Sequence, residues 1–354
     1  MVLFPGVIEG MVRNMSIKKK SNEDGEKEAA REMAKEAKRN KSMICLSGSV
    51  KTSKFDDMAY VCTKRGNKGI NQDSLVVWED YGCQGDVVFC GIFDGHGPWG
   101  HMISKQVRKS LPLELLTNWQ QNLSLEADQN LFPFNIWKQS CLKSYAAIDE
   151  ELKQHPRIDS FYSGTTALTV VKQGRNLVVA NAGDSRAVLA VTSDDGCLKP
   201  VQLSVDFKPN LPEEAERIKQ SRGRVVCLKD EPGVYRVWTP NSGTPGLAIS
   251  RAFGDYCTKQ YGLISVPDVS HRTITSGDQF VIVATDGVWD VMSNQEAVHI
   301  VSSTSNREMS AKRLVNCASR AWKSKKRGIA RDDMSAICLF FNASLTENDR
   351  DVNI

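Results

Sequence analysis

The stretch DVVFCGIFDGHG, residues 86–97, decides the fold class, because a short valine-rich run leads directly into Asp94, Gly95 and His96. Runs of this length and composition are typical of buried strands. Similar runs recur at 58–63, 74–78, 165–171, 176–182, 186–191, 223–228, 279–285 and 335–341. Several follow one another with only a turn between them, and such neighbours pair antiparallel. The sequence therefore predicts an α+β sandwich instead of an alternating parallel sheet.

Two longer segments between these runs have helical periodicity. The apolar face of residues 134–154 consists of Ile136, Trp137, Cys141, Leu142, Tyr145 and Ile148. That of residues 310–327 consists of Ala311, Leu314, Val315, Ala318 and Trp322. Both spacings predict amphipathic helices, and Gly328 is well placed to end the second. Residues 229–246 are rich in turn-forming residues and predict a long surface flap.

Composition excludes several classes of protein. The chain has 354 residues, with 46 Lys and Arg against 42 Asp and Glu, a net charge of +4. So small an excess does not indicate a nucleic-acid binder. No apolar run reaches the roughly 18 residues of a membrane-spanning helix, and residues 1–16 lack the features of a secretory signal. Ten cysteines without C-x-x-C spacing indicate reduced thiols, so we expect a cytoplasmic or nuclear protein.

Changes of composition predict how the chain is organised. Residues 1–55 are charged, and within them 17–41 alternate acidic and basic residues around one large apolar side chain, Met33. A helix there has no apolar face to bury, so we expect a flexible extension. Lys18–Lys20 leaves open a membrane-surface or nuclear-address role. The folded domain is expected at 56–343, with its flap at about 222–246, and a polar tail at 344–354.

Five aspartates stand at the ends of predicted strands. Asp94, Asp184 and Asp286 each follow an apolar run, whereas Asp73 and Asp332 each precede one. The end of one antiparallel strand lies beside the start of its neighbour, so we expect all five carboxylates on one rim. Clustered carboxylates repel one another, and a site made only of oxygen ligands suits Mg²⁺ or Mn²⁺. The alternative at any single position is an ordinary Asp-Gly turn.

His96 and Asp290 are further candidates beside this rim. His96 lies two residues after Asp94 and between two glycines, which let the backbone approach a ligand closely. At neutral pH an imidazole can donate a proton to a leaving alkoxide, although a single histidine is often structural. Asp290 follows Asp286 by four residues and faces the same rim if a helix begins there.

Seven blocks of sequence, in one order, resemble those of the metal-dependent serine/threonine protein phosphatases of type 2C, and in particular a plant branch of them. The blocks are DGHGPWG (94–100), SGTTA (163–167), NAGDSR (181–186), DFKP (206–209), LAISRAFGD (247–255), ATDGVWDV (284–291) and RDDMSAI (331–337). The resemblance extends from about Ala59 to Phe341. It implies a four-layer α/β/β/α sandwich, in which helices flank two central antiparallel sheets and a metal site lies at one edge.

The resemblance also implies roles for the rim. Asp94 would bridge two ions, Mg²⁺ or Mn²⁺, with the carbonyl of Gly95 binding the first and Asp286 and Asp332 holding the second. Three more aspartates would lie farther out, near metal-bound water or around a third, weaker ion: Asp73, Asp184 and Asp290. The SGTTA block would place Thr166 nearby, either as a packed strand residue or with a part in catalysis.

The implied activity is hydrolysis of phosphoserine and phosphothreonine in phosphoprotein substrates by a metal-activated hydroxide, with His96 protonating the leaving oxygen. Family members often carry arginine where this chain has Lys68 and glutamate where it has Gln72. Lysine offers a point charge instead of a bidentate fork, so we expect Lys68 to hold the substrate phosphate differently. Two alternatives stay open: a pseudophosphatase that binds phosphoproteins or serves as a scaffold, and a hydrolase of small phosphate esters.

The expected partners are phosphoprotein substrates of a monomeric enzyme, without nucleic acid and without membrane insertion. Trp238, in the flap, is expected to anchor the flap to its own domain instead of docking a receptor. The basic run 323–327 is either a nuclear address or the last turn of the 310–327 helix, where the helix dipole favours cations.

Overall fold

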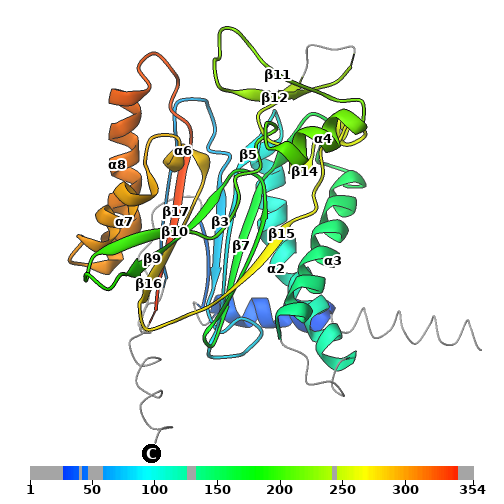
Figure 1. Cartoon of the computed structure of the whole chain (residues 1–354). Helices are drawn as coiled ribbons and strands as arrows, with labels where there is room; N and C mark the ends of the chain where they lie inside the picture. Colours follow the sequence, from blue (N-terminus) through cyan, green and yellow to red (C-terminus); the bar gives the residue numbers. More distant parts are fainter. Residues whose placement is uncertain (1–26, 40–41, 47–58, 126–132, 241–244, 342–354) are drawn as a thin grey trace, which may run out of the picture.

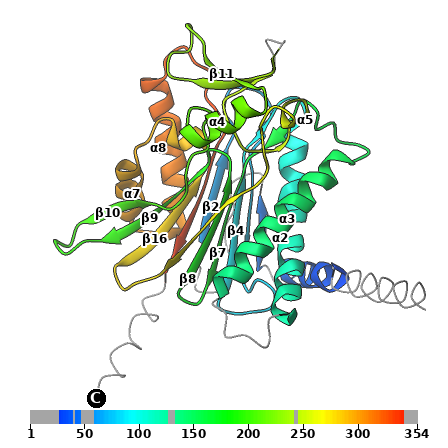
Figure 2. The ribbon, with the colours of Figure 1, turned by 45° about the vertical axis from the view of Figure 1, so that its right-hand side comes forward.

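Four layers make up the molecule, a computed structural model that describes residues 27–39, 42–46, 59–125, 133–240 and 245–341 (Figures 1 and 2). Two antiparallel sheets pack face to face. Helices α2 (Gly100–Leu125) and α3 (Pro133–Lys153) cover the first sheet, and α7 (Asn294–Ser302) and α8 (Ser310–Lys325) cover the second. The predicted four-layer α/β/β/α sandwich is confirmed.

Every pairing within the two central sheets is antiparallel. The first sheet has the order β1 (Met43–Leu46), β3 (Ser74–Trp78), β4 (Val87–Phe93), β7 (Ala167–Gln173), β8 (Asn176–Ala182) and β15 (Asp268–Thr273). The second has the order β10 (Leu198–Gln202), β9 (Arg186–Thr192), β16 (Asp278–Ala284), β17 (Met334–Phe340) and β2 (Ala59–Lys64). The predicted strand runs at 58–63, 74–78 and 335–341 fall on β2, β3 and β17.

Strand alternation explains why there are three apolar layers. In β4, Val87 and Phe89 pack toward the helices of the first sheet, whereas Val88 and Cys90 pack between the sheets. Successive side chains of a strand point to opposite faces, so a strand buried on both faces is apolar throughout. The same division in β16 sends alternate residues to the inter-sheet core and to the core under α7 and α8.

The two small sheets lie at one end of the sandwich (Figure 1). A three-stranded sheet has the order β14 (Phe253–Gly254), β6 (Gly164–Thr165) and β5 (Gly95–His96). The flap forms another, from β11 (Arg224–Cys227), β12 (Tyr235–Trp238) and β13 (Pro245–Leu247), beside α4 (Pro212–Gln220). Short helices α5 (Tyr256–Lys259), α6 (Asp286–Trp289) and η1 (Arg307–Met309) complete the fold. In the flap, the ring of Trp238 packs so closely on Gly246 that a Cβ there would lie 2.6 Å from it, in keeping with a role as an internal anchor.

The expectation that residues 17–41 have no face to bury is wrong for their described part. Residues 27–39 form a helix whose Ala30, Ala34 and Ala37 are buried in the core beneath α2 and α3, with Met33 packed against it. Alanines at helical spacing make a narrow stripe that allows close approach, although no large side chain marks it. The strand β1 then joins the first sheet, so parts of the expected extension belong to the domain. Residues 1–26 and the tail at 344–354 lie outside the described residues.

None of the helices in the described ranges combines the length and apolarity needed to cross a membrane. The nine cysteines whose side chains are described are free thiols.

Candidate active site

The backbone of Asp94 is fixed by the neighbouring strand. Its N–H donates to Thr166 Oγ1 at 3.1 Å, and its carbonyl accepts from the Thr166 N–H at 2.9 Å and from the Thr165 hydroxyl at 3.0 Å. Thr166 is itself buried and lies 3.2 Å from the Ser185 hydroxyl. The carboxyl of Asp94 therefore projects from a main chain that is held on both sides.

The five aspartates expected at the rim form one electrostatic cluster. Burial raises the pKa of Asp94 well above its usual range, and four other carboxylates raise it further: Asp286, Asp73, Asp332 and Asp184. Burial also raises the pKa of Asp286, with Asp184 and Asp332 adding to it. Groups that shift one another in this way lie close together in a medium of low dielectric. Removing this repulsion requires positive charge at the rim.

Two buried carboxyl oxygens of this cluster have no hydrogen-bond partner among the described residues. They are Asp73 Oδ1 and Asp286 Oδ1. The second oxygen of Asp73 accepts from the Thr285 hydroxyl at 3.0 Å, and burial raises the pKa of Asp73 to about 7. Buried polar atoms are normally satisfied, so unpaired carboxyl oxygens in an acidic cluster fit a cation-binding site.

Two lysines supply positive charge to the rim. Lys68 Nζ pairs with Asp332 Oδ2, and Lys208 Nζ pairs with Asp184 Oδ2. Burial by itself would lower the pKa of Lys208, but the charges of Asp184 and Asp286 outweigh it and raise that pKa. Within the described ranges, no three Asp, Glu, His or Cys side chains converge tightly enough to hold a metal ion as they stand. Asp290, at the end of α6, is exposed beside the same cluster.

His96 contacts the rim from the small three-stranded sheet, and its partner is Asp255. Its Nε2 lies 2.6 Å from Asp255 Oδ2, and the two side chains are 26% and 1% exposed. Burial by itself would lower the pKa of His96, but the charge and hydrogen bond of Asp255 outweigh it and raise that pKa. Gly164 packs against this pair, since a Cβ there would come within 2.2 Å of Asp255 Oδ2 and 2.8 Å of His96 Nε2. The arrangement favours the protonated form of the imidazole at the edge of the acidic rim.

Comparison with known proteins agrees with this geometry. The model of the family described as Protein phosphatase 2C matches residues 60–326. The chain belongs to the protein phosphatase 2C family. It is 56% identical to "Probable protein phosphatase 2C 73" of Arabidopsis thaliana, across 96% of this chain and 95% of that protein. It is 53% identical to "Probable protein phosphatase 2C 48" of Oryza sativa subsp. japonica, across 95% of this chain and 98% of that protein.

A solved member of the 2C family has the same fold. The serine-threonine phosphatase 2C of Toxoplasma gondii superposes with a TM-score of 0.75 at 25% identity, covering 85% of this chain and 99% of its own. The predicted family, its plant-like character and the enzyme class of a protein phosphatase are thus confirmed. The metal ligands predicted for this 2C phosphatase stay predictions.

Three contacts at the candidate site of this 2C phosphatase were not predicted from the sequence. Asp255 partners His96, Lys208 partners Asp184, and Asp333 accepts from the backbone N–H groups of Gly66 at 2.7 Å and Gln72 at 2.8 Å. Two of these residues lie within the quoted blocks LAISRAFGD and DFKP, and Asp333 lies within RDDMSAI. Their places in those blocks could have indicated that they lie near the site. The residues that they contact could not be predicted, because those contacts depend on the tertiary fold.

The loop that carries Lys68 and Gln72 is held by Asp333, at the start of the segment leading into β17. Gln72 turns its side-chain amide away from the carboxylates and donates to the Gly97 carbonyl at 3.1 Å. Lys68 is 52% exposed on its side chain and faces Asp332. The two departures from the common family pattern therefore sit on one loop of the 2C phosphatase, at the mouth of the acidic rim.

Proposed function

We propose that this chain is a metal-dependent phosphatase of phosphoserine and phosphothreonine in protein substrates. The observation that carries the proposal is the buried acidic cluster with two unpaired carboxyl oxygens, beside a histidine whose pKa is raised. An acidic cluster binds cations, and a protonated imidazole can protonate a leaving oxygen. Together they provide what hydrolysis of a phosphate monoester requires.

Mg²⁺ or Mn²⁺ fits the rim by its donor chemistry, since every candidate ligand is oxygen. Asp94, the Gly95 carbonyl, Asp286 and Asp332 would hold two ions. When bound, such ions lower the pKa of water and offset the charge of phosphoryl oxygens. Asp332 lies beyond the range that the family model matches, so its part rests on the RDDMSAI block. Asp184 and Asp290, with Asp73 nearby, would serve a third, weaker ion.

His96 is the residue that would protonate the departing serine or threonine oxygen. Asp255 fixes the ring through Nε2 and raises the pKa of His96, which favours the protonated form that this step requires. An alkoxide is a poor leaving group, and protonation as the P–O bond breaks removes that obstacle. The substrate phosphate would meet Lys68, which offers three rotatable donors and one positive charge.

The experiment is phosphate release from a phosphothreonine peptide by the full chain, titrated with Mn²⁺ and Mg²⁺. Asp94→Asn and Asp286→Asn are compared with the wild type, and Asp194→Asn in an exposed turn is the matched control. We expect cation-dependent release that both rim variants abolish and the control retains. Folded wild-type protein without turnover at any cation concentration would overturn the proposal in favour of a phosphoprotein-binding role.

A further inference from the structure

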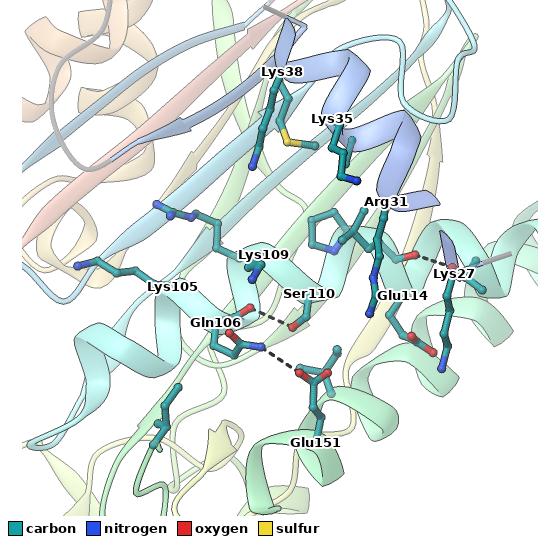
Figure 3. A pocket seen from close by; sticks show the side chains of 18 of the residues that line it. Lys27, Arg31, Lys35, Lys38, Lys105, Gln106, Lys109, Ser110, Glu114 and Glu151 are labelled. Carbon is teal, nitrogen blue, oxygen red and sulfur yellow. Dashed lines mark hydrogen bonds between the residues drawn. The ribbon is translucent and has the colours of Figure 1, made fainter. Parts of the chain in front are cut away.

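A groove with a volume of about 850 Å³ lies between the helix at 27–39, α2 and α3 (Figure 3). The helix at 27–39 forms one wall of this groove, and α2 forms the opposite wall. That helix precedes residue 60, where the match to the phosphatase family begins. The groove is therefore a feature that the family domain by itself does not provide.

Basic side chains line both walls of the groove. They are Lys27, Arg31, Lys35 and Lys38 on the helix at 27–39, and Lys105, Arg108 and Lys109 on α2. Figure 3 shows Lys38 pointing across the groove toward α2, whereas Arg31 points toward Glu114. Within the described ranges Lys38, Lys105 and Lys109 form no ion pair, whereas Lys35 pairs with Glu32 and Arg31 with Glu28. Like charges on facing walls repel, and an anionic ligand between them removes that cost.

The two acidic residues of the groove do not balance this charge. Glu151 accepts from the Gln106 amide at 2.9 Å, and Glu114 accepts from the Asn118 amide at 3.1 Å. These are two carboxylates against seven basic side chains in the lining of the groove. The potential between the walls stays positive.

The floor of the groove is apolar. It is made by Ala34, Met43, Met102, Pro112, Leu113, Ile148 and Ile158. Met102 is 39% exposed, and methionine adapts its shape to different apolar partners. A purely inorganic anion would leave this floor in contact with water. An apolar floor between basic walls matches a protein segment that carries both acidic and apolar side chains.

The groove begins close to the candidate active site. Helix α2 starts at Gly100, shortly after His96, and Met102 and Lys105 line the groove from its first turns. The lining then follows α2 to Thr117, about 22 Å farther along the axis at 1.5 Å per residue. A chain that reaches the catalytic rim can thus continue along α2.

We propose that this groove docks an acidic segment with interspersed apolar residues in protein substrates, apart from their phosphorylated residue. The proposal rests on the proposed function and names a second point of substrate contact. Two linked contacts raise the effective concentration of the phosphorylated residue at the rim without changing the chemical step. The groove therefore acts on KM and not on kcat.

The first test measures binding directly, with no catalysis. The probe is a fluorescein-labelled peptide of about 12 residues with paired glutamates and leucines at helical spacing, added to the full chain and followed by anisotropy. The groove variant is Lys38→Glu/Lys105→Glu/Lys109→Glu. The matched control, Lys312→Glu/Arg320→Glu/Lys323→Glu, makes the same charge change on the exposed face of α8. We expect the groove variant to bind about tenfold or more weakly, and the control to bind within about twofold of the wild type.

Four results of this test would overturn the proposal. An equal loss of affinity in the α8 control would mean that the peptide is attracted by the overall positive charge of the protein and not by the groove. A peptide with serine in place of leucine that binds as well means that the apolar floor takes no part. Tripolyphosphate that competes as strongly as the peptide means a small-anion site, and anionic vesicles that bind in preference to the peptide mean a membrane contact.

The second test joins docking to turnover. A phosphothreonine peptide is fused to the glutamate–leucine segment through a flexible Gly/Ser linker of about ten residues. Fusion is expected to lower KM several-fold for the wild type and the α8 control, with kcat unchanged, and to give no benefit to the groove variant. Hydrolysis of p-nitrophenyl phosphate should be the same in all three proteins. If none of the proteins hydrolyses p-nitrophenyl phosphate, the proposed function is wrong. If hydrolysis is normal but fusion does not lower KM for the wild type, only the proposed docking role of the groove is wrong.

Discussion

His96 Nε2 lies 2.6 Å from Asp255 Oδ2, although the two residues are 159 positions apart in the chain. Asp255 adopts a left-handed backbone conformation, with φ of 53°, at the start of α5. Its other oxygen, Oδ1, is buried without a partner among the described residues. A strained, buried and singly paired aspartate is costly to keep. The contact of Asp255 with His96 explains why an aspartate is kept in this position.

The leaving group decides how much the enzyme needs His96. We expect His96→Ala to lower kcat on a phosphothreonine peptide by about 10²–10⁴-fold, because an alkoxide must be protonated as it departs. On p-nitrophenyl phosphate the loss should be at least about tenfold smaller, since p-nitrophenolate departs without a proton. Steady-state kinetics on both substrates at saturating Mn²⁺ measures the difference. Equal losses would show that His96 does not act as the proton donor.

The pH dependence of kcat should depend on Asp255. The carboxylate raises the pKa of His96 against the effect of burial, so the imidazole keeps its proton to higher pH. An acid catalyst loses activity as the pH rises through its pKa. Asp255→Asn removes the charge that raises the pKa of His96 and should move the alkaline limb of the kcat profile to lower pH. We expect kcat to fall several-fold at pH 8 and less at pH 6. Asp194→Asn, in an exposed turn, is the control. An unmoved limb would contradict the role of Asp255.

Lys68 is expected to compete with cations for Asp332. Its ammonium group pairs with the carboxylate that is proposed to hold a metal ion. Lys68→Ala is expected to lower the Mn²⁺ concentration for half-maximal activity by about two- to fivefold, the scale of an exposed ion pair, while raising KM for the phosphopeptide. Lys68→Arg keeps the charge and serves as the control. A cation requirement that stays the same or rises in Lys68→Ala would show that the pair does not compete with metal.

Short apolar runs predicted the buried strands such as β4 and β16, and helical periodicity predicted α3 and α8, because each has one or two complete apolar faces. The strands β10 and β15 lack such a face and were not predicted. Periodicity did not predict α2, whose Pro112 lies inside the helix and whose apolar residues face both the sheet and α3. The helix at 27–39 was missed for a related reason, since Ala30, Ala34 and Ala37 bury little area each and carry a weak signal. Burial at such positions is decided by the approach of α2 and α3.

The candidate site was likewise predicted from the sequence only in part. The acidic cluster followed from aspartates at strand ends, because sheet geometry brings strand ends together. The pairing of His96 with Asp255 did not follow, since it requires β5, β6 and β14 to lie side by side and a glycine, Gly164, to leave room for the two side chains. Spacing along the chain carries no information on that contact.

Acid stability should depend on Glu214 in α4. Its side chain is 2% exposed and accepts from Arg217, Ser250 and Arg251. Burial alone would raise the pKa of Glu214, but these hydrogen bonds outweigh it and lower the pKa to about 2 from 4.5. A lowered pKa stabilises the folded state at pH values above the pKa that the group has in the unfolded chain. This stabilisation is lost as the pH falls from 4.5 toward 2.

Glu214→Gln tests this contribution. At pH 7 we expect the variant to lose about 3 kcal/mol in free energy of unfolding, because Arg217 and Arg251 lose their carboxylate. The difference from the wild type should shrink as the pH falls below about 4.5, where the wild-type carboxyl begins to lose its advantage. Urea unfolding at a series of pH values measures both quantities. Glu216→Gln, exposed on the same helix, should change little at any pH. A Glu214→Gln deficit that is the same at pH 7 and pH 3 would mean that the charge of Glu214 is not what stabilises α4, and that shape and neutral hydrogen bonding suffice.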